Sequence, residues 1–153
     1  MGEAIVKGEN INGVKIQPLK QIKDERGSVM HMLRSDSPYY EQFGEVYFST
    51  VKQGVVKAWK QHKVMTQNFA VPVGMIKLVI YDDRPKSTTK GNLLEIHNGM
   101  NHYSLIKIPV KLWYGFQGLD KGFSLIANCT TIPHNDNEIT IVDYKESDIP
   151  YRW

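Results

Sequence analysis

Hydrophobic and polar residues alternate along short segments of this chain, which is the two-residue period of a β-strand. From Gly44 onward these segments are rich in β-branched and aromatic residues and are separated by short breaks: 45–51, 54–62, 66–73, 75–82, 92–96, 103–108, 112–119 and 123–131. Regularly spaced short strands with turn signals between them are typical of all-β sandwiches and barrels. The pattern therefore predicts an all-β fold in which helices are short and peripheral.

The length of 153 residues suits one domain with a sizeable core, and we expect residues 1–153 to form it. Residues 1–12 are polar, with glycines and asparagines, and predict an N-terminal arm before an alternating strand at 13–17. Residues 134–153 are a polar tail, which we expect to pack against the barrel.

The region before Gly44 predicts a turn, a strand and a helix. Residues 23–28 are highly charged and suit a solvated hairpin tip, after which residues 29–33 alternate again. The sequence Ser35-Asp36-Ser37-Pro38 offers a capping side chain and an early proline. We therefore expect a short helix over 38–43.

Charge and cysteine content exclude several classes of function. The formal net charge is +3 and the pI is near 8.9, but there is no run of lysine and arginine and no basic stripe with aromatic residues between. Nucleic-acid binding is therefore not expected. The single Cys129 cannot form an internal disulfide and fits a reducing compartment. Because neither a signal peptide nor a membrane-spanning apolar run is seen, we expect a cytoplasmic protein without a membrane partner.

The stretch from Gly54 to Gly74 carries the densest cluster of residues that can do chemistry. Its spacing follows G-x5-H-x-H-x4-E-x6-G, the frame of the first cupin motif, with Lys60 at the first histidine and Gln67 at the glutamate. Only His62 is kept. Because residues two apart in a strand face the same side, Lys60 and His62 should point together.

A second frame downstream agrees with the first. Pro109, Lys111 and Tyr114 occupy the positions P-x-G-x2-H of the second cupin motif, with Tyr114 at the last histidine. Together the frames predict a cupin fold, the double-stranded β-helix or jelly-roll barrel. One imidazole does not hold a catalytic metal tightly, so we expect a site of hydrogen-bonding and ionisable groups with no metal and no cofactor.

The order of these landmarks resembles the dTDP-4-dehydrorhamnose 3,5-epimerase family, nucleotide-sugar enzymes on a metal-free cupin barrel, over about residues 13–150. The matching segments are Asp24-Glu25-Arg26-Gly27 for D-x-R-G, residues 54–59 for GVLRG-L, residues 82–91 for D-x-R-x-x-S-x-T-x-G, and Ile108-Pro109 with Gly115-Phe116 for IP…HGF. The resemblance implies that Arg26 meets the sugar-nucleotide diphosphate, often in the partner's pocket, and that two chains exchange N-terminal strands in a homodimer. Lys57, in place of a family arginine, is expected to bind diphosphate too.

The resemblance also locates the departures from the family. Its catalytic histidine falls at Lys60, its enolate-steadying lysine at Gln67, and its acid tyrosine near Ala127 or Asn128. The buried aspartate that orients the family's histidine would lie near Asp148. The fold therefore follows from the resemblance more directly than the mechanism does.

Epimerisation beside a ketone needs a base, a donor for the enolate oxygen and a proton source on the opposite face. The catalytic candidates are His62, Lys60 and Tyr114. His62 has a suitable intrinsic pKa, Lys60 is either a base or a charged oxyanion donor, and Tyr114 is a proton donor. The expected substrate-binding residues are Arg26, His31, Glu45, Lys57, Gln67 and Asn128. His31 is included because it shares a strand face with Val29 and Leu33.

We therefore expect an epimerase or isomerase of an NDP-4-keto-6-deoxyhexose, dTDP-linked by the resemblance. It would act by α-proton abstraction and reprotonation in deoxysugar and surface polysaccharide biosynthesis. The alternative is a non-catalytic sugar-nucleotide-binding cupin that has lost the family's catalytic histidine and tyrosine, with His62 a structural residue. A metal-dependent cupin ranks last for want of ligands.

Overall fold

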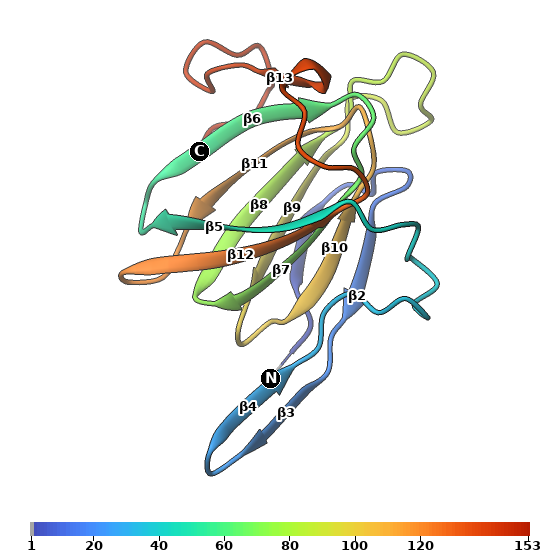
Figure 1. Cartoon of the computed structure of the whole chain (residues 1–153). Helices are drawn as coiled ribbons and strands as arrows, with labels where there is room; N and C mark the ends of the chain where they lie inside the picture. The colour runs from blue at the N-terminus through green and yellow to red at the C-terminus, as the bar shows by residue number, and fades with distance from the viewer. Residues whose placement is uncertain (1) are drawn as a thin grey trace.

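The computed structural model describes residues 2–153 and confirms the all-β cupin-type fold (Figure 1). Its only helical element in that range is the 3-10 helix η1 (Asp136–Glu138), so no helix there is long and apolar enough to span a membrane. The strands are β1 (Ile5–Gly8), β2 (Lys15–Pro18), β3 (Gln21–Asp24), β4 (Gly27–Met30), β5 (Glu45–Lys52), β6 (Val56–His62), β7 (Gln67–Val73), β8 (Met75–Tyr81), β9 (Leu93–Gly99), β10 (Ser104–Ile108), β11 (Trp113–Gly118), β12 (Phe123–Thr130) and β13 (Ile139–Ile141).

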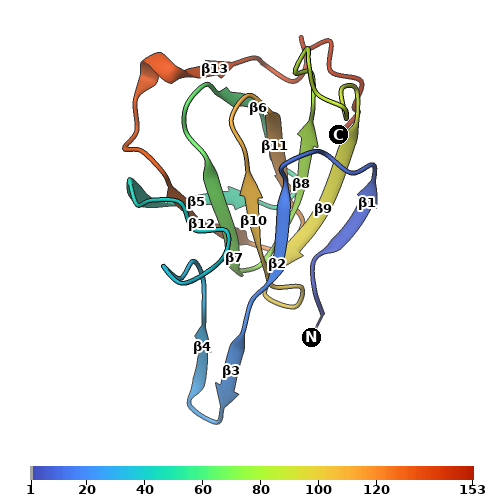
Figure 2. The same ribbon diagram turned by 90° about the vertical axis from the view of Figure 1, so that its right-hand side faces the viewer.

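Two antiparallel sheets face each other and enclose the core (Figure 2). One has the order β1-β9-β8-β11-β6-β13 and the other the order β2-β10-β7-β12-β5. Their inner faces meet through side chains that water does not reach, among them Leu78 and Ile80 from β8, Val71 from β7 and Ile106 from β10. Burial of this apolar surface between the sheets is the main stabilising term of such a fold.

The backbone conformation explains why glycines stand at both ends of the first cupin frame. Gly54 and Gly74 both have a φ of 77°, in the left-handed region that favours glycine. Gly74 joins β7 to β8, and a side chain there would collide with Ser124 of β12. The frame in the sequence therefore marks where the strands of the barrel turn.

The hairpin formed by β3 and β4 extends away from the two sheets (Figure 1, blue). The charged segment 23–28 forms its solvated tip, as expected. The strand expected over 29–33 ends earlier, at Met30, and Val29 is 59% exposed. The hairpin thus presents apolar surface that this chain does not cover.

The helix expected over 38–43 does not form. The amides of Tyr39 and Tyr40 bond back to Ser37, which gives a single turn, but the carbonyl of Tyr39 then accepts from Lys107 Nζ at 3.1 Å. Lys107 also pairs with Glu41 at 2.6 Å. The capping side chain and the proline thus correspond to a single turn at Ser37. The prediction failed because a side chain from β10 takes the carbonyl that a helix would use.

Both ends of the chain add a strand to the six-stranded sheet. The segment expected to be an arm contains β1, which pairs with β9, while Met1 lies outside the described residues. The C-terminal segment contains β13, which pairs with β6, and then Tyr151 and Trp153 pack on Trp59. The Trp59 and Trp153 ring centroids are 5.2 Å apart.

The segment 82–91 is held together by one buried carboxylate. Asp82 is 0% exposed and accepts hydrogen bonds from Arg84, at 2.8 Å to each oxygen, from Ser87 at 2.6 Å and from Thr89 at 2.7 Å. Burial by itself raises the pKa of Asp82, but these hydrogen bonds outweigh it and hold the pKa well below its usual value. The D-x-R-x-x-S-x-T pattern is therefore a structural clasp for this loop.

We predict that Asp82→Asn lowers the free energy of unfolding at pH 7 by about 2–3 kcal/mol, because the charge-assisted bonds are lost. The pKa of Asp82 is lowered by folding, so its stabilising contribution is complete above the ordinary pKa and declines as the pH falls from there toward the lower pKa of the folded state. The difference between wild type and variant should therefore shrink at pH 3.

Urea denaturation at pH 7 and pH 3 measures the free energy of unfolding of wild type and variant, and so the difference between them at each pH. The matched control is Asp83→Asn, which changes the exposed neighbouring carboxylate and should cost less than about 1 kcal/mol. Equal losses in the two variants would contradict the assignment.

Candidate active site

A small hollow of about 210 Å³ opens between the two sheets and brings the three catalytic candidates together. Lys60 and His62 come from the end of β6, and Tyr114 from the start of β11. Tyr114 lies opposite Lys60 in the register of the two strands, which places it on the same wall. The other lining residues are Glu45 and Tyr47 from β5, His134 from the loop after β12, and Ile139 from β13.

His62 is fixed by a buried carboxylate that lies 76 residues further along the chain. Its Nδ1 hydrogen-bonds Glu138 Oε1, and both side chains are almost fully buried. Glu138 Oε2 accepts from the amides of Val64 and Met65, at 3.1 and 3.2 Å. Burial raises the pKa of Glu138, but the bonds from His62 and the two amides outweigh it and lower the pKa. An ionised carboxylate only accepts, so Nδ1 of His62 carries a proton, and Nε2 is the ring nitrogen left for another partner.

Tyr114 lies against the free nitrogen of this imidazole. Its hydroxyl is 3.3 Å from His62 Nε2, and the two rings stack at an interplanar angle of 13°. Burial strongly raises the pKa of Tyr114, so the phenol stays protonated at neutral pH. A protonated phenol can donate a hydrogen bond to Nε2 when no ligand is bound.

Lys60 supplies the positive charge of the hollow. Its side chain is half-buried, and within residues 2–153 its ammonium group has no ion-pair partner. Burial lowers the pKa of Lys60, and the charge of nearby Lys57 lowers it further. A cation in this position would attract an oxyanion.

Two buried amides, Gln67 and Asn128, are linked by hydrogen bonds to a residue that lines the hollow. Asn128 Nδ2 donates to Gln67 Oε1 at 3.0 Å and to the hydroxyl of Tyr47 at 2.9 Å. Gln67 and Asn128 are 1% and 2% exposed and do not line the hollow themselves. Tyr47 does line it, and so it connects these amides to the interior space.

Three of the residues expected at the site lie elsewhere in this chain. Arg26 is at the tip of the β3–β4 hairpin, with 82% of its side chain exposed and paired to Asp24. His31 lines a separate hollow with Met32 and Arg34, so the expectation that it shares the His62 pocket is wrong for a single chain. His31 directly follows β4, and its amide donates to the carbonyl of Lys20 at 3.0 Å, which keeps it at the base of the hairpin. Lys57 donates to the carbonyl of Thr50 at 2.6 Å and does not line the hollow.

Sequence reasoning missed three groups at this site. The carboxylate that orients the histidine is Glu138, and Asp148 lies instead by an outer hollow with Tyr81 and Trp113. His134, to which we gave no role, donates its amide to Glu45 Oε1 at 2.9 Å and lines the hollow. Tyr47 could have been found, because it lies two residues from Glu45 and alternation puts both on one face.

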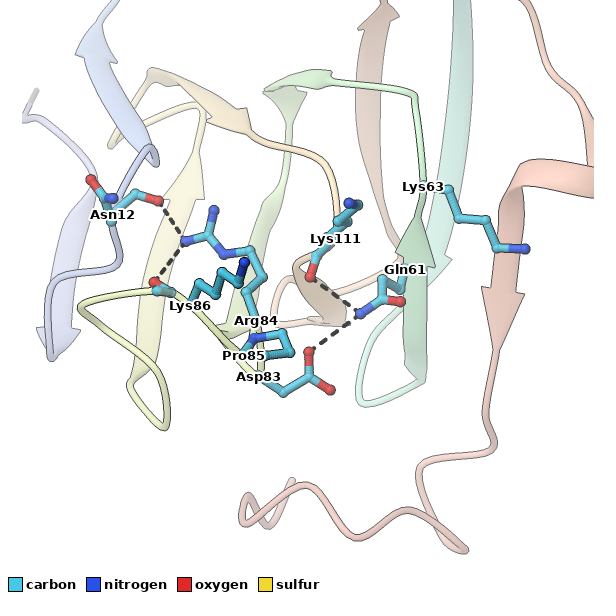
Figure 3. Close-up of a pocket in the computed structure, with 9 residues that line it drawn as sticks. Asn12, Gln61, Lys63, Asp83, Arg84, Pro85, Lys86 and Lys111 are labelled. Carbon is cyan, nitrogen blue, oxygen red and sulfur yellow. Dashed lines mark hydrogen bonds between the residues drawn. The ribbon is translucent and has the colours of Figure 1, made fainter.

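A larger hollow, drawn in Figure 3, lies elsewhere in the structure. It measures about 770 Å³, and neither a histidine nor a tyrosine lines it. Gln61 bonds the carbonyl of Lys111 there, and Arg84 bonds the carbonyl of Asn12. Its remaining cations, Lys63, Lys86 and Lys111, are exposed on the surface. The smaller hollow contains the histidine and tyrosine side chains, so we place the candidate site there.

Among residues 2–153 no group of three or more His, Cys, Asp or Glu side chains is arranged so that it could hold a metal ion.

Comparison with known proteins gives close relatives over nearly the whole chain. No family model matches the sequence. The "probable low-salt glycan biosynthesis epimerase" of Haloferax volcanii is 35% identical over an alignment of 147 residues that covers 93% of this chain and 89% of that protein. The crystal structure of a dTDP sugar isomerase from Desulfovibrio desulfuricans is 47% identical, covers 94% of this chain and 92% of its own, and superposes with a TM-score of 0.91.

A more distant solved structure shares the fold. The dTDP-4-dehydrorhamnose 3,5-epimerase of Sulfolobus tokodaii has a TM-score of 0.79 at 22% identity, over 96% of this chain and 87% of that one. The fold, the cupin frames and the close relatives agree. The chain belongs to the dTDP-4-dehydrorhamnose 3,5-epimerase family of cupin-fold sugar-nucleotide epimerases and isomerases.

Proposed function

We propose that this protein epimerises an NDP-4-keto-6-deoxyhexose, with dTDP as the nucleotide, in the synthesis of deoxysugars for surface polysaccharide. The observation that carries the proposal is the buried His62–Glu138 pair, whose free nitrogen faces a hollow that also contains Lys60. The names of the relatives support the class of reaction and substrate, because one is an isomerase of dTDP sugars and another an epimerase of glycan biosynthesis.

His62 is the base in this proposal. Its Nε2 takes the proton from the carbon beside the ketone, the C–H electron pair forms the enolate double bond, and the carbonyl oxygen becomes negative. The imidazolium that results is stabilised by the carboxylate of Glu138, because Nδ1–H already donates to it. Tyr114 donates to Nε2 in the resting state and gives way when the substrate enters.

Lys60 stabilises the enolate oxygen. A partly buried ammonium group is a strong partner for a developing oxyanion, since the low dielectric of the hollow strengthens the attraction. This arrangement provides within the protein the electrostatic stabilisation that a metal ion would give, and we propose that the reaction uses neither metal nor cofactor.

The functional unit is a homodimer in this proposal, with each chain a single domain. The hairpin presents Ile22 and Val29, which are 47% and 59% exposed. Strand β5 is an edge of the five-stranded sheet and exposes Val46 at 44% and Phe48 at 66%. An exposed edge strand with apolar side chains is a ready site for another strand. The occupant we propose is the hairpin of a second copy, which would bring Arg26 to the partner's pocket as a ligand for diphosphate.

The proposed reaction predicts exchange of the α-proton. Incubation with dTDP-4-keto-6-deoxyglucose in deuterated water should place deuterium at C3, C5 or both, with inverted product, as followed by NMR. A chelator should leave the rate unchanged. Binding of the substrate without exchange would instead support the non-catalytic sugar-nucleotide-binding alternative.

We predict that His62→Asn slows α-proton exchange by about a hundred- to ten-thousand-fold while substrate affinity changes little, because asparagine keeps a hydrogen bond but cannot move the proton. Lys60→Met should also slow exchange, through loss of the oxyanion partner. Glu138→Gln should lower kcat by about tenfold or more with KM nearly constant, because it removes the charge that stabilises the imidazolium.

The matched control is Glu95→Gln, which alters a second histidine–carboxylate pair, with His97 at 2.9 Å on β9. Its kcat should equal that of wild type. A loss of kcat in the control as large as in Glu138→Gln, or normal exchange in His62→Asn, would refute the assigned roles.

Light scattering tests the homodimer. Wild type should have twice the chain mass of 17.6 kDa at micromolar concentration. Phe48→Glu should give a monomer, because burying an unpaired charge at the edge strand is costly. Ile141→Glu, at a residue 64% exposed on the edge of the other sheet, is the control and should stay dimeric.

Arg26→Ala should weaken dTDP binding about tenfold in the dimer. A monomeric wild type, or unchanged affinity in Arg26→Ala, would contradict this part of the proposal.

A further inference from the structure

Inversion at carbon requires that the second proton arrive on the face opposite to the base. The candidate base His62, its partner Lys60 and Tyr114 all come from the six-stranded sheet. The hollow is closed on the other side by β5 of the five-stranded sheet. A substrate ring between the two walls therefore has His62 on one face and the side chains of β5 on the other.

Two side chains of β5, Glu45 and Tyr47, line the hollow, and they differ in whether they can donate a proton. Glu45 is held at the loop after β12, because its Oε1 accepts a hydrogen bond from the amide of His134 at 2.9 Å. The His134 imidazole is tied to Asp136 at 2.7 Å, and its side chain is 56% exposed. This leaves Tyr47 as the hydroxyl donor of the wall that faces His62.

The hydroxyl of Tyr47 is arranged to release its proton into the hollow. Its oxygen accepts a hydrogen bond from Asn128 Nδ2 at 2.9 Å, and Asn128 lies directly opposite it in the register of β5 and β12. Within the described chain the phenol's own proton has no acceptor. The hydroxyl of Tyr114, by contrast, lies against His62 and could return a proton only to the base's side.

Resting on the proposed function, we propose that Tyr47 is the catalytic acid that protonates the enolate on the face opposite His62. The Tyr47 O–H bond breaks, its electron pair stays on the phenolate oxygen, and the enolate double bond supplies the pair for the new C–H bond. One turnover leaves His62 protonated and Tyr47 ionised. Proton transfer with solvent then restores both groups, so atoms and charge balance.

The surroundings of Tyr47 fit both of its states. Burial raises the pKa of Tyr47, and the charges of Glu45 and Glu138 raise it further, so the phenol is protonated before the reaction. The Asn128 amide opposes this rise, because its N–H stabilises the phenolate. Lys60 lines the same hollow and would stabilise the phenolate as well.

Tyr47→Phe separates this role from the role of His62. In deuterated water the variant should still exchange the α-proton at a rate within about threefold of wild type, because His62 removes it and returns deuterium to the same face. Inversion, measured by NMR as epimerised product, should fall by about a hundredfold or more. The readout is the ratio of inversion to exchange, which a purely structural role would not change.

Tyr114→Phe and Tyr39→Phe are the matched controls, and both should keep the wild-type ratio of inversion to exchange. Normal inversion in Tyr47→Phe would overturn the proposal. Loss of both exchange and inversion in a folded Tyr47→Phe protein would overturn it too, since Tyr47 would then act before reprotonation. Absence of exchange in wild type would instead refute the proposed function itself.

Fluorinated tyrosine answers the same question if Tyr47→Phe does not fold. In the Tyr114→Phe protein made with 3-fluorotyrosine, the lower pKa of the phenol should move the alkaline loss of inversion to lower pH, while exchange keeps its pH profile. The other titratable groups around Tyr47 in this protein are unaltered by the label; they are Glu45, Lys60, His62, His134 and Glu138. An unshifted inversion profile would count against Tyr47.

Discussion

The buried bond between His62 Nδ1 and Glu138 Oε1 is the contact on which this site depends. A carboxylate taken out of water is costly unless its oxygens are satisfied, and Glu138 has donors from His62, Val64 and Met65. The same residue therefore fixes the imidazole and shapes the turn after β6. Because β13 begins at the next residue and pairs with β6, the C-terminal segment is part of the site's support.

The two facing sheets divide the chemistry of the hollow between them. The six-stranded sheet contributes the imidazole and the ammonium group, and β5 contributes a carboxylate and a phenol. Side chains on different sheets keep their separation, because the packed core between the sheets does not readily deform. Such a fixed separation suits a reaction in which a proton leaves one face of a ring and another arrives at the opposite face.

Sequence motifs of this family serve two different physical purposes in the chain. The segment 82–91 is its most specific local match, yet Asp82 uses its bonds to close a loop and takes no part in the hollow. The segment 54–74 combines both purposes, since its glycines allow the chain to turn while Lys60 and His62 face the interior. A strong motif match thus supports the fold more firmly than it supports the chemistry.

The sequence by itself determined the strands, the barrel and one wall of the site. Alternation is a local property, so the shared face of Lys60 and His62 followed from their spacing, and the glycines of the first frame marked real turns. The second frame also identified Tyr114, which lies opposite Lys60 on this wall, although β6 and β11 are far apart in the chain and no turn joins them.

Only the tertiary structure decided which distant residues complete the site. The partner of His62 is Glu138 rather than Asp148, and the helix expected over 38–43 is lost to Lys107, because both results depend on side chains far away in the sequence. Tyr47 gained its importance from lying opposite Asn128, and Arg26 lies far from the hollow because its hairpin leaves the sheets. Local pattern fixes which way a side chain faces along its own strand. What it meets there depends on the packing of sheets whose strands are far apart in the chain.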